Sequence, residues 1–239
     1  MKLPSTLVPL IFALSILAVC NATAAPIVNG DFQGPAGTNQ VPAPWAIVNF
    51  TPDTLQAGGI PFGAGSAAPG IPGSPNGGTF GGAQAELGIF AESFEQNVAG
   101  LTIGTAYRVI FHQANAGYIS GANNRLDPGR WDVAFGGQTL QTPVLAWAGQ
   151  NLQTWHEVTL IFGNAAAANQ ILRFTALDVA GGATSGTGMA VDGIRVEAVP
   201  IVIPEPATGL LVGLGGSCAL AVARTRRLRS RVPPRLPST

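Results

Sequence analysis

The chain has 239 residues, of which 32 are glycine and 19 are proline, while only 10% of the side chains are charged. This composition excludes a basic nucleic-acid-binding protein and a coiled coil, and it disfavours a helix-rich globule. The formal net charge of zero conceals a separation. Five arginines and eleven acidic residues between positions 25 and 203 give that segment a charge of −6, whereas six arginines lie between positions 224 and 235. Such a separation is typical of a chain addressed to a membrane.

The first 24 residues have the three parts of a secretory signal peptide. Lys2 gives the positive start, Leu7 to Val19 the apolar helix, and Ala22 to Ala24 a small-residue cleavage site. We therefore expect export and a mature protein that begins at Ala25. A lipoprotein box ending at Cys20 is an alternative, but Val19 is bulky where a small residue is wanted. A retained anchor is disfavoured because the apolar run is too short to span a bilayer.

Residues 25 to 199 have the pattern of an all-β domain, with short alternating segments between Gly, Pro, Asn and Asp turns. Apolar residues occupy every second position in four segments: Tyr107 to Phe111, Trp131 to Phe135, Val158 to Phe162 and Leu172 to Ala176. The two cysteines, Cys20 and Cys218, lie outside this domain, so a packed core and not a disulfide must stabilise it.

Two segments of this domain depart from simple alternation. Between residues 189 and 199 the apolar positions change parity, which predicts a β-bulge at Asp192-Gly193 that re-aims Asp192. Gly58 to Gly82 is rich in small residues and has almost no bulky core candidates. We predict that Gly58 to Gly82 is a mobile surface loop.

Four motifs in the domain carry a resemblance. They are Val28 to Gln33 followed by Trp45, Phe94 to Gln96, Leu101 to Tyr107, and Val191 to Ile194. Together they resemble galactose-binding-like jelly rolls, the β-sandwiches of many carbohydrate-binding modules. The resemblance implies a jelly-roll β-sandwich.

The same resemblance implies a structural calcium ion held by the opening and closing segments. Asp31 and Asp192 would supply the hard oxygen donors that calcium prefers. Gln33 stands where such modules often have Glu, which removes one charged ligand. Turn and capping roles are the alternative for both aspartates.

A catalytic constellation is not evident in the sequence. His112 and His156 lie in separate strand-like segments and not in a short metal motif. A glycosidase needs two facing carboxylates, and the candidates are Glu86, Glu92, Glu95, Asp127 and Asp132. Solvated strand faces explain these acids equally well. We therefore expect a non-catalytic domain that requires no cofactor and binds no nucleic acid.

Glycan binding combines aromatic rings with planar polar groups. The candidate ligand-binding residues are Tyr118, Asn123, Arg125, Arg130 and Trp147. Tyr118 lies in a polar, loop-like segment and is expected to be the best exposed aromatic residue. Trp131 and Trp155 begin strand patterns and are expected in the core. A structural role is the alternative for each of these aromatic residues.

A proline-bounded linker, residues 200 to 206, follows the β domain. After Pro204, Glu205 and Pro206 comes the uncharged run Ala207 to Ala223, which as a helix would be about 26 Å long, at the short limit for a membrane span. The tail, residues 224 to 239, begins with an arginine cluster at Arg224, Arg226 and Arg227. The positive-inside rule places this tail in the cytoplasm and the β domain outside.

This order resembles the PEP-CTERM sorting signal of Gram-negative bacteria. In that family an exosortase, a membrane-embedded cysteine protease or transpeptidase, recognises the tripeptide and helix and removes the tail. The resemblance implies recognition through Pro204, Glu205 and Pro206, and stop-transfer at the arginine cluster. The Val232 to Thr239 extension departs from the family, whose tails usually end soon after the arginines.

The whole sequence therefore predicts an exported protein that is transiently anchored in the inner membrane and then reaches the cell surface or the extracellular matrix. The expected partners are an exosortase and extracellular polysaccharide. Two alternatives stay open for the β domain: a structural surface protein without a specific glycan ligand, and a glycan-active enzyme.

Overall fold

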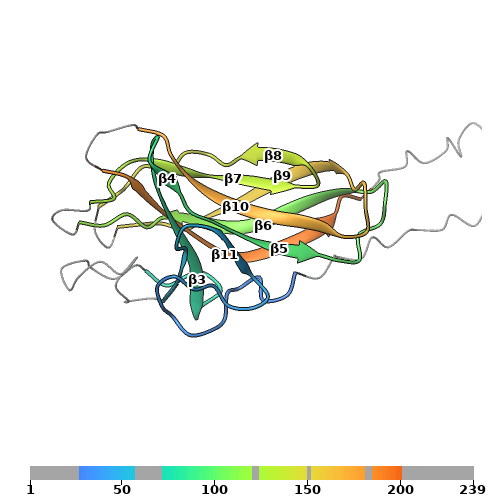
Figure 1. Cartoon of the computed structure of the whole chain (residues 1–239), viewed down its shortest axis with the longest axis horizontal. Coiled ribbons are helices and arrows are strands. Elements are labelled where there is room, and N and C mark those ends of the chain that lie inside the picture. Colours follow the sequence, from blue (N-terminus) through green and yellow to red (C-terminus); the bar gives the residue numbers. More distant parts are fainter. Residues whose placement is uncertain (1–26, 57–71, 120–123, 150–151, 181–184, 201–239) are drawn as a thin grey trace, which may run out of the picture. The chain divides into compact units, whose positions relative to one another are not determined.

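The computed structural model describes residues 27–56, 72–119, 124–149, 152–180 and 185–200 (Figure 1). The chain divides into two compact units, Met1–Val199 and Pro200–Thr239. The predicted signal peptide, sorting tripeptide, membrane helix and arginine tail lie outside the described residues. The described ranges hold no helix, and hence none that could cross a membrane.

The described part of the first unit is an all-β sandwich, as predicted. Its strands are β1 (Ala46–Asn49), β2 (Asp53–Gln56), β3 (Thr79–Glu86), β4 (Phe90–Ala91), β5 (Ser93–Val98), β6 (Ala106–Asn115), β7 (Gly129–Phe135), β8 (Gln138–Gln141), β9 (His156–Asn164), β10 (Gln170–Asp178) and β11 (Thr187–Ala198).

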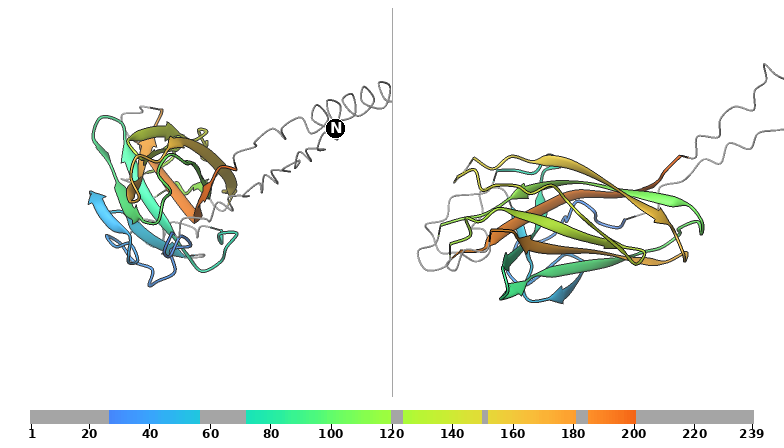
Figure 2. Two further views of the ribbon diagram at one scale, coloured as in Figure 1. Left: turned by 90° about the vertical axis from the view of Figure 1, so that its right-hand side faces the viewer. Right: turned by 90° about the horizontal axis from the view of Figure 1, so that it is seen from above.

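These strands form two antiparallel sheets that pack face to face (Figure 2). The five-stranded sheet has the order β1-β5-β10-β7-β8, and the six-stranded sheet has the order β2-β3-β11-β6-β9, with β4 pairing with β3. From β5 onward the chain passes from one sheet to the other at every connection except the β7–β8 hairpin. Connections that cross between the two sheets in this way are typical of a jelly roll.

The core lies between the sheets and is dominated by aromatic rings. The predicted alternating segments supply it, because Val109, Trp131 and Phe174 are fully buried on strands whose intervening side chains face outward. Phe94 stacks on Phe174 at 5.9 Å, and Trp131 meets Phe174 edge-on at 5.7 Å. Period-two alternation therefore predicted these strands because one face of each is buried.

The predicted β-bulge in β11 is confirmed. Asp192 pairs with His112 and Arg195 with Ile110, so two residues of β11 stand opposite one residue of β6. Gly193 has a φ of 63°, a left-handed conformation that glycine adopts without a steric penalty. Ile194 consequently stays in the core, while Asp192 is turned to the outer face of the six-stranded sheet.

The prediction of a surface loop from Gly58 to Gly82 is wrong at its carboxyl end. Residues 57–71 lie outside the described part of the chain, but Thr79 to Gly82 form the first half of β3, which pairs with β2 on one side and β11 on the other. The glycine here marks a close approach: a Cβ atom on Gly81 would lie 2.8 Å from Cε1 of Phe32. Glycine at position 81 leaves space for the Phe32 ring, so the small residues of this segment do not indicate a loop.

Candidate functional site

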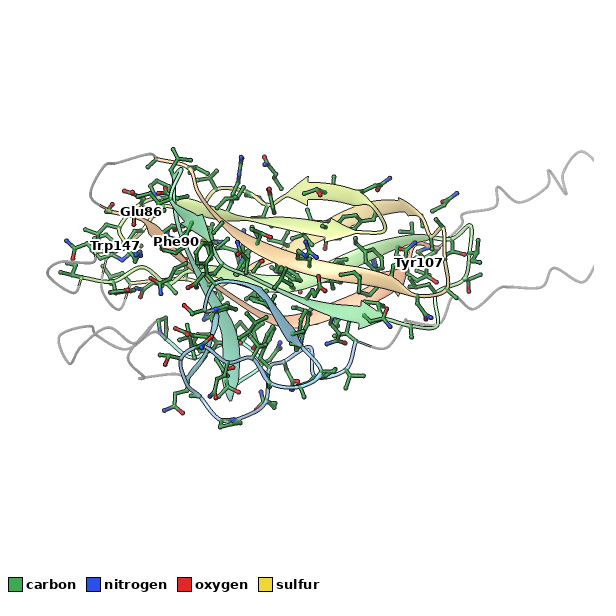
Figure 3. All side chains as sticks on the ribbon, viewed as in Figure 1. Glu86, Phe90, Tyr107 and Trp147 are labelled. Carbon is green, nitrogen blue, oxygen red and sulfur yellow. The ribbon has the colours of Figure 1, made fainter. Side chains whose placement is uncertain are left out.

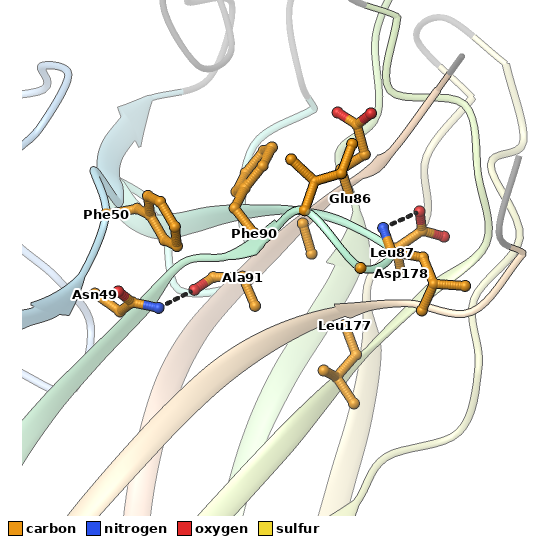
Figure 4. Close-up of a pocket in the computed structure, with 11 residues that line it drawn as sticks. Asn49, Phe50, Glu86, Leu87, Phe90, Ala91, Leu177 and Asp178 are labelled. Carbon is orange, nitrogen blue, oxygen red and sulfur yellow. Dashed lines mark hydrogen bonds between the residues drawn. The ribbon is translucent and has the colours of Figure 1, made fainter. Parts of the chain in front are cut away.

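A pocket of about 360 Å³ opens at one end of the sandwich, where the connection between β1 and β2 meets the β3–β4 hairpin (Figure 4). Its lining residues are Asn49, Phe50, Ala85, Glu86, Leu87, Gly88, Ile89, Phe90, Ala91, Leu177 and Asp178. Figure 3 places Glu86 and Phe90 toward the same end as Trp147, with Tyr107 toward the other end. The pocket thus combines residues from three segments that lie far apart in the sequence.

The walls of the pocket are aromatic and aliphatic. The rings of Phe50 and Phe90 lie 5.5 Å apart at an angle of 62°, and Phe50 is 51% exposed. Phe50 also has a φ of 54°, which a bulky residue rarely adopts. The hairpin tip adds Leu87 and Ile89, which are 59% and 68% exposed. Large exposed apolar side chains that gather in this way indicate a binding surface.

Polar groups surround these apolar walls. The Asn49 side-chain amide nitrogen donates to the Ala91 carbonyl at 2.9 Å, and the Asp178 carboxylate accepts from the Leu87 backbone N–H at 3.1 Å (Figure 4). The Glu86 carboxylate lies 3.6 Å from the guanidinium of Arg125. The rim therefore offers a carboxamide and two carboxylates whose orientations are fixed by contacts within the domain.

Arg125 is predicted from the sequence to bind ligand, but the structure places it behind the pocket wall. Its guanidinium lies 5.4 Å from the Phe90 ring centre, in cation–π geometry, and its Nε donates to the Gln84 side-chain oxygen at 2.9 Å. Only 11% of its side chain is exposed. Arg125 thus holds Phe90 and Glu86 in position, and most of its surface is covered by the domain itself.

Tyr118 is also placed behind the pocket, so the expectation that it is the best exposed aromatic residue is wrong. It is only 4% exposed, because its ring packs in a second apolar cluster that includes Leu55 and Phe80 on the outer face of the six-stranded sheet. Its hydroxyl donates to the same Gln84 oxygen that accepts from Arg125. In this position the ring cannot stack on a sugar.

The other predicted ligand residues are not gathered with the pocket in one group. The Trp147 indole N–H donates to the Gly117 carbonyl at 3.1 Å, which joins two loops at the same end of the sandwich. Arg130 is the second residue of β7 and lies on the outer face of the five-stranded sheet. Asn123 lies outside the described residues.

Two buried carboxylates, Glu92 and Asp53, follow pocket residues closely in the sequence but do not line the pocket. Glu92 accepts from the Gln84 backbone N–H at 2.7 Å and from the Thr51 hydroxyl at 3.0 Å, while Asp53 accepts from the Asn39 backbone N–H at 2.7 Å. Burial, helped by the nearby charge of Glu92 and opposed by the hydrogen bond from Asn39, raises the pKa of Asp53 to about 7. Burial likewise raises the pKa of Glu92, although its hydrogen bonds and Arg125 oppose that shift.

The carboxylates considered as a glycosidase pair are dispersed by the fold. Glu92 is only 2% exposed, Glu86 faces Arg125, and Glu95 pairs with Arg173 at 2.6 Å on the other sheet. His112 lies 3.9 Å from Glu157, whereas His156 is within hydrogen-bonding distance of Thr154. The histidines are therefore held by contacts within the domain and do not face the pocket.

The segments that carry the predicted calcium ligands lie side by side, since the Ile194 backbone N–H donates to the Gly30 carbonyl at 2.9 Å. Asp192 is fully buried, and the charge of Asp31 is close enough to add to the effect of burial, which raises the pKa of Asp192 to about 6. Its Oδ2 atom accepts from the Ser74 hydroxyl, but its Oδ1 atom is buried without a hydrogen-bond partner. That unpaired oxygen is suited to a cation. Within the described ranges, no group of three or more His, Cys, Asp or Glu side chains is arranged to hold a metal.

The chain matches no protein-family model, and no curated protein matches it. Similar solved structures include an arabinose-bound α-L-arabinofuranosidase, with 14% identity, a TM-score of 0.47 and coverage of 74% of this chain but only 27% of that one. A family 61 carbohydrate-binding module in complex with β-1,4-galactotriose has 15% identity and a TM-score of 0.37, covering 66% of this chain and 90% of the module. A family 36 module in complex with calcium and xylotriose has 15% identity and a TM-score of 0.33, covering 61% and 98%. At these values the likeness concerns the fold.

Sequence analysis did not identify Phe50, Phe90 or Asp178 as site residues. One local signal was present: Leu87-Gly88-Ile89-Phe90 places three large apolar residues around a turn glycine. A hairpin tip is normally polar, so such a tip indicates a surface that contacts something. The proximity of Phe50 depends on the pairing of distant strands and has no local signal.

Proposed function

We propose that residues 25–199 form a non-catalytic, galactose-binding-like jelly-roll domain that binds a glycan. The pocket is the observation that carries this proposal, since it brings two aromatic rings together with carboxylate and carboxamide groups at an open end of the sandwich. Sugar rings pack their apolar faces on aromatic side chains, and their hydroxyls hydrogen-bond to planar polar groups. The fold by itself selects no ligand.

The pocket is built to receive a sugar with little rearrangement. Arg125 fixes the Phe90 ring from one side, so the ring loses little freedom when a ligand stacks on it. Thr51, next to Phe50, is tied to the buried Glu92 carboxylate at 3.0 Å, which anchors the opposite wall. The Asn49 amide oxygen has no partner among the described residues and can accept from a sugar hydroxyl.

Catalysis by a carboxylate pair is less well supported by this geometry. A glycosidase requires an acid and a second carboxylate on either side of the scissile bond. The two acids whose pKa values are raised, Asp53 and Glu92, are each 2% exposed and are hydrogen-bonded to the backbone. A substrate in the pocket does not reach them in this arrangement.

We further propose that the protein is a substrate of an exosortase. The support is the sequence order of Pro204 to Pro206, the uncharged run Ala207 to Ala223, and the arginine cluster at 224, 226 and 227. In this proposal the signal peptide exports the chain, the helix anchors it transiently in the inner membrane, and processing releases the β domain to the cell surface or matrix. Extracellular polysaccharide is then the available partner.

A structural calcium ion at Asp31 and Asp192 also belongs to this proposal. The unpaired, buried Oδ1 atom of Asp192 would coordinate the ion, with the nearby Asp31 carboxylate as a second charged ligand. Because calcium takes six to eight oxygen ligands, backbone carbonyls and water would have to complete the shell. Its contribution would be to the stability of the domain.

The binding proposal is tested with the Phe90→Ala variant of the 25–203 fragment on an array of defined oligosaccharides and by calorimetry on the sugars that the wild type retains. Removing one wall of the pocket should weaken sugar binding at least about tenfold, while leaving the fold intact. Ile103→Ala is the matched control, because Ile103 is 66% exposed and does not line the pocket. Unchanged affinity in Phe90→Ala would contradict the pocket, and a wild type that binds no glycan would favour a structural surface protein.

A further inference from the structure

Arg130 differs from the other arginines of the described domain. Arg108, Arg125, Arg173 and Arg195 each form an ion pair with a glutamate within 4.0 Å. Arg130 forms no ion pair with any residue in the described ranges, and its half-buried side chain keeps its Nε atom covered and without a hydrogen-bond partner. An arginine that is partly removed from water and left unpaired is costly unless something else binds it.

Asp132, two residues further along β7, also has a buried polar atom without a hydrogen-bond partner. Trp131 and Val133 point into the core, so Arg130 and Asp132 both project from the outer face of the five-stranded sheet. The Oδ1 atom of Asp132 is likewise buried without a partner. A donor and an acceptor of opposite charge therefore lie side by side, yet they are not paired with each other.

This pair adjoins the pocket. Leu177 lines the pocket, and in the pairing of β10 with β7 it stands directly opposite Arg130. Thr175 stands opposite Asp132 in the same register and adds a hydroxyl to this face. Neighbouring strands are about 4.8 Å apart, so Arg130 and Asp132 lie one strand beyond the pocket wall.

The size of the pocket limits what it can hold. A volume of about 360 Å³ is near the lower end of the range for small-molecule sites. It accommodates about one sugar ring, so further units of a glycan chain must lie outside it. Leu177 lines the pocket and shares the outer face of the five-stranded sheet with Arg130 and Asp132, so a chain that leaves the pocket over Leu177 reaches these two residues.

We propose that Arg130 and Asp132 form a second subsite that binds adjacent hydroxyls of the next sugar unit, so that the ligand is a neutral glycan chain extending from the pocket across β10 onto β7. This inference rests on the proposed function. A hydroxyl both donates and accepts, so one hydroxyl can accept from the Arg130 guanidinium while its neighbour donates to the Asp132 carboxylate. Arg130 and Asp132 together carry no net charge, so the pair gives no net attraction to an anionic or a cationic sugar. The charge of −6 on residues 25 to 203 further disfavours a uronic acid, so we expect a neutral unit.

The test compares Arg130→Met and wild type by calorimetry with neutral xylo-, cello- and galacto-oligosaccharides of one to six units. Methionine keeps an apolar stem but removes the charged donor. We expect Arg130→Met to bind the oligosaccharides at least about tenfold more weakly and to bind the single sugar as the wild type does. Arg173→Met is the matched control, because Arg173 projects from the same sheet but pairs with Glu95; its affinities should not change.

The outcomes distinguish a failure of the second subsite from a failure of the pocket itself. If Phe90→Ala loses binding while Arg130→Met binds long oligosaccharides as tightly as wild type, the second subsite is wrong and the pocket stands. Equal weakening of the single sugar and the oligosaccharides by Arg130→Met would also overturn the subsite, as would tighter binding of oligogalacturonate than of neutral chains. Failure of the wild type to bind any of these sugars would overturn both.

Discussion

Single residues of this domain illustrate which site features are local in the sequence and which are not. Tyr118 lies in a polar segment, but its burial depends on Leu55 and Phe80, which come from two other strands. Phe50 and Phe90 are distant in sequence and meet because β1 pairs with β5, which places Asn49 opposite Ser93. Arg125 was predicted as a ligand residue because it lies in a polar, loop-like segment, and the structure places it against Phe90 and Glu86. The sequence thus predicted neither the aromatic residues that line the pocket nor the burial of Tyr118, because both depend on contacts between distant strands.

Asp53 makes the stability of the domain depend on pH. Its folded-state pKa is raised from 3.8 to about 7, so between these values the folded carboxyl binds a proton that the unfolded chain has released. The free energy of unfolding should therefore be highest below about pH 4 and fall by about 2–4 kcal/mol as the pH rises through 7. In urea unfolding measured from pH 4 to 8, Asp53→Asn should remove the part of the slope that Asp53 contributes and leave the parts that come from Asp192 and Glu92. Glu157→Gln, at an exposed position, should retain the full slope; a variant Asp53→Asn with the wild-type slope would refute the assignment.

At the scale of the elements, alternation predicted the strands that have one strictly apolar face, including β6, β7 and β10. It also located the bulge in β11, because a bulge shifts the parity of the apolar positions. It failed for β3, whose inward positions are Gly81, Ala83 and Ala85. Small residues at a strand centre give no hydrophobic signal, although here they create the space that Phe32 fills. A search for alternating bulky apolar residues therefore misses a strand such as β3, whose inward positions hold only glycine and alanine.

Asp192 directly precedes the bulge in β11 and lies on the outer face of the sheet with one unpaired oxygen. Calcium bound there should raise the melting temperature of the wild-type fragment, with a stabilisation of about 2.7 kcal/mol when free calcium is a hundredfold above its dissociation constant. Asp192→Asn should abolish the calcium-dependent rise in thermal melts with and without chelator. Asp127→Asn, on another segment, should respond like wild type. A wild-type melting temperature that ignores both calcium and chelator would exclude the ion.

For the molecule as a whole, charge divides the chain into two parts. The segment from residue 25 to 203 carries −6, and four of its five arginines are engaged in ion pairs with glutamates. Bulk electrostatics would therefore repel an acidic polymer, and attraction must come from local contacts. This agrees with a neutral glycan as the ligand of the pocket and the Arg130–Asp132 subsite.

Six of the seven remaining positively charged residues lie in the tail, which leads to a prediction about processing. If Glu205 is part of the recognised tripeptide, Glu205→Ala removes its only charge, and the chain should persist as an unprocessed, membrane-retained form. Immunoblots of membrane and culture fractions, in a host that possesses an exosortase, would show the precursor at its full size in the membrane fraction. Glu197→Ala, which changes a nearby acid outside the tripeptide, should be processed normally. Processing removes all six terminal arginines, so the released wild-type protein should also have a lower isoelectric point than the precursor. A Glu205→Ala protein that reaches the wild-type mature size and is released normally would exclude this route of sorting.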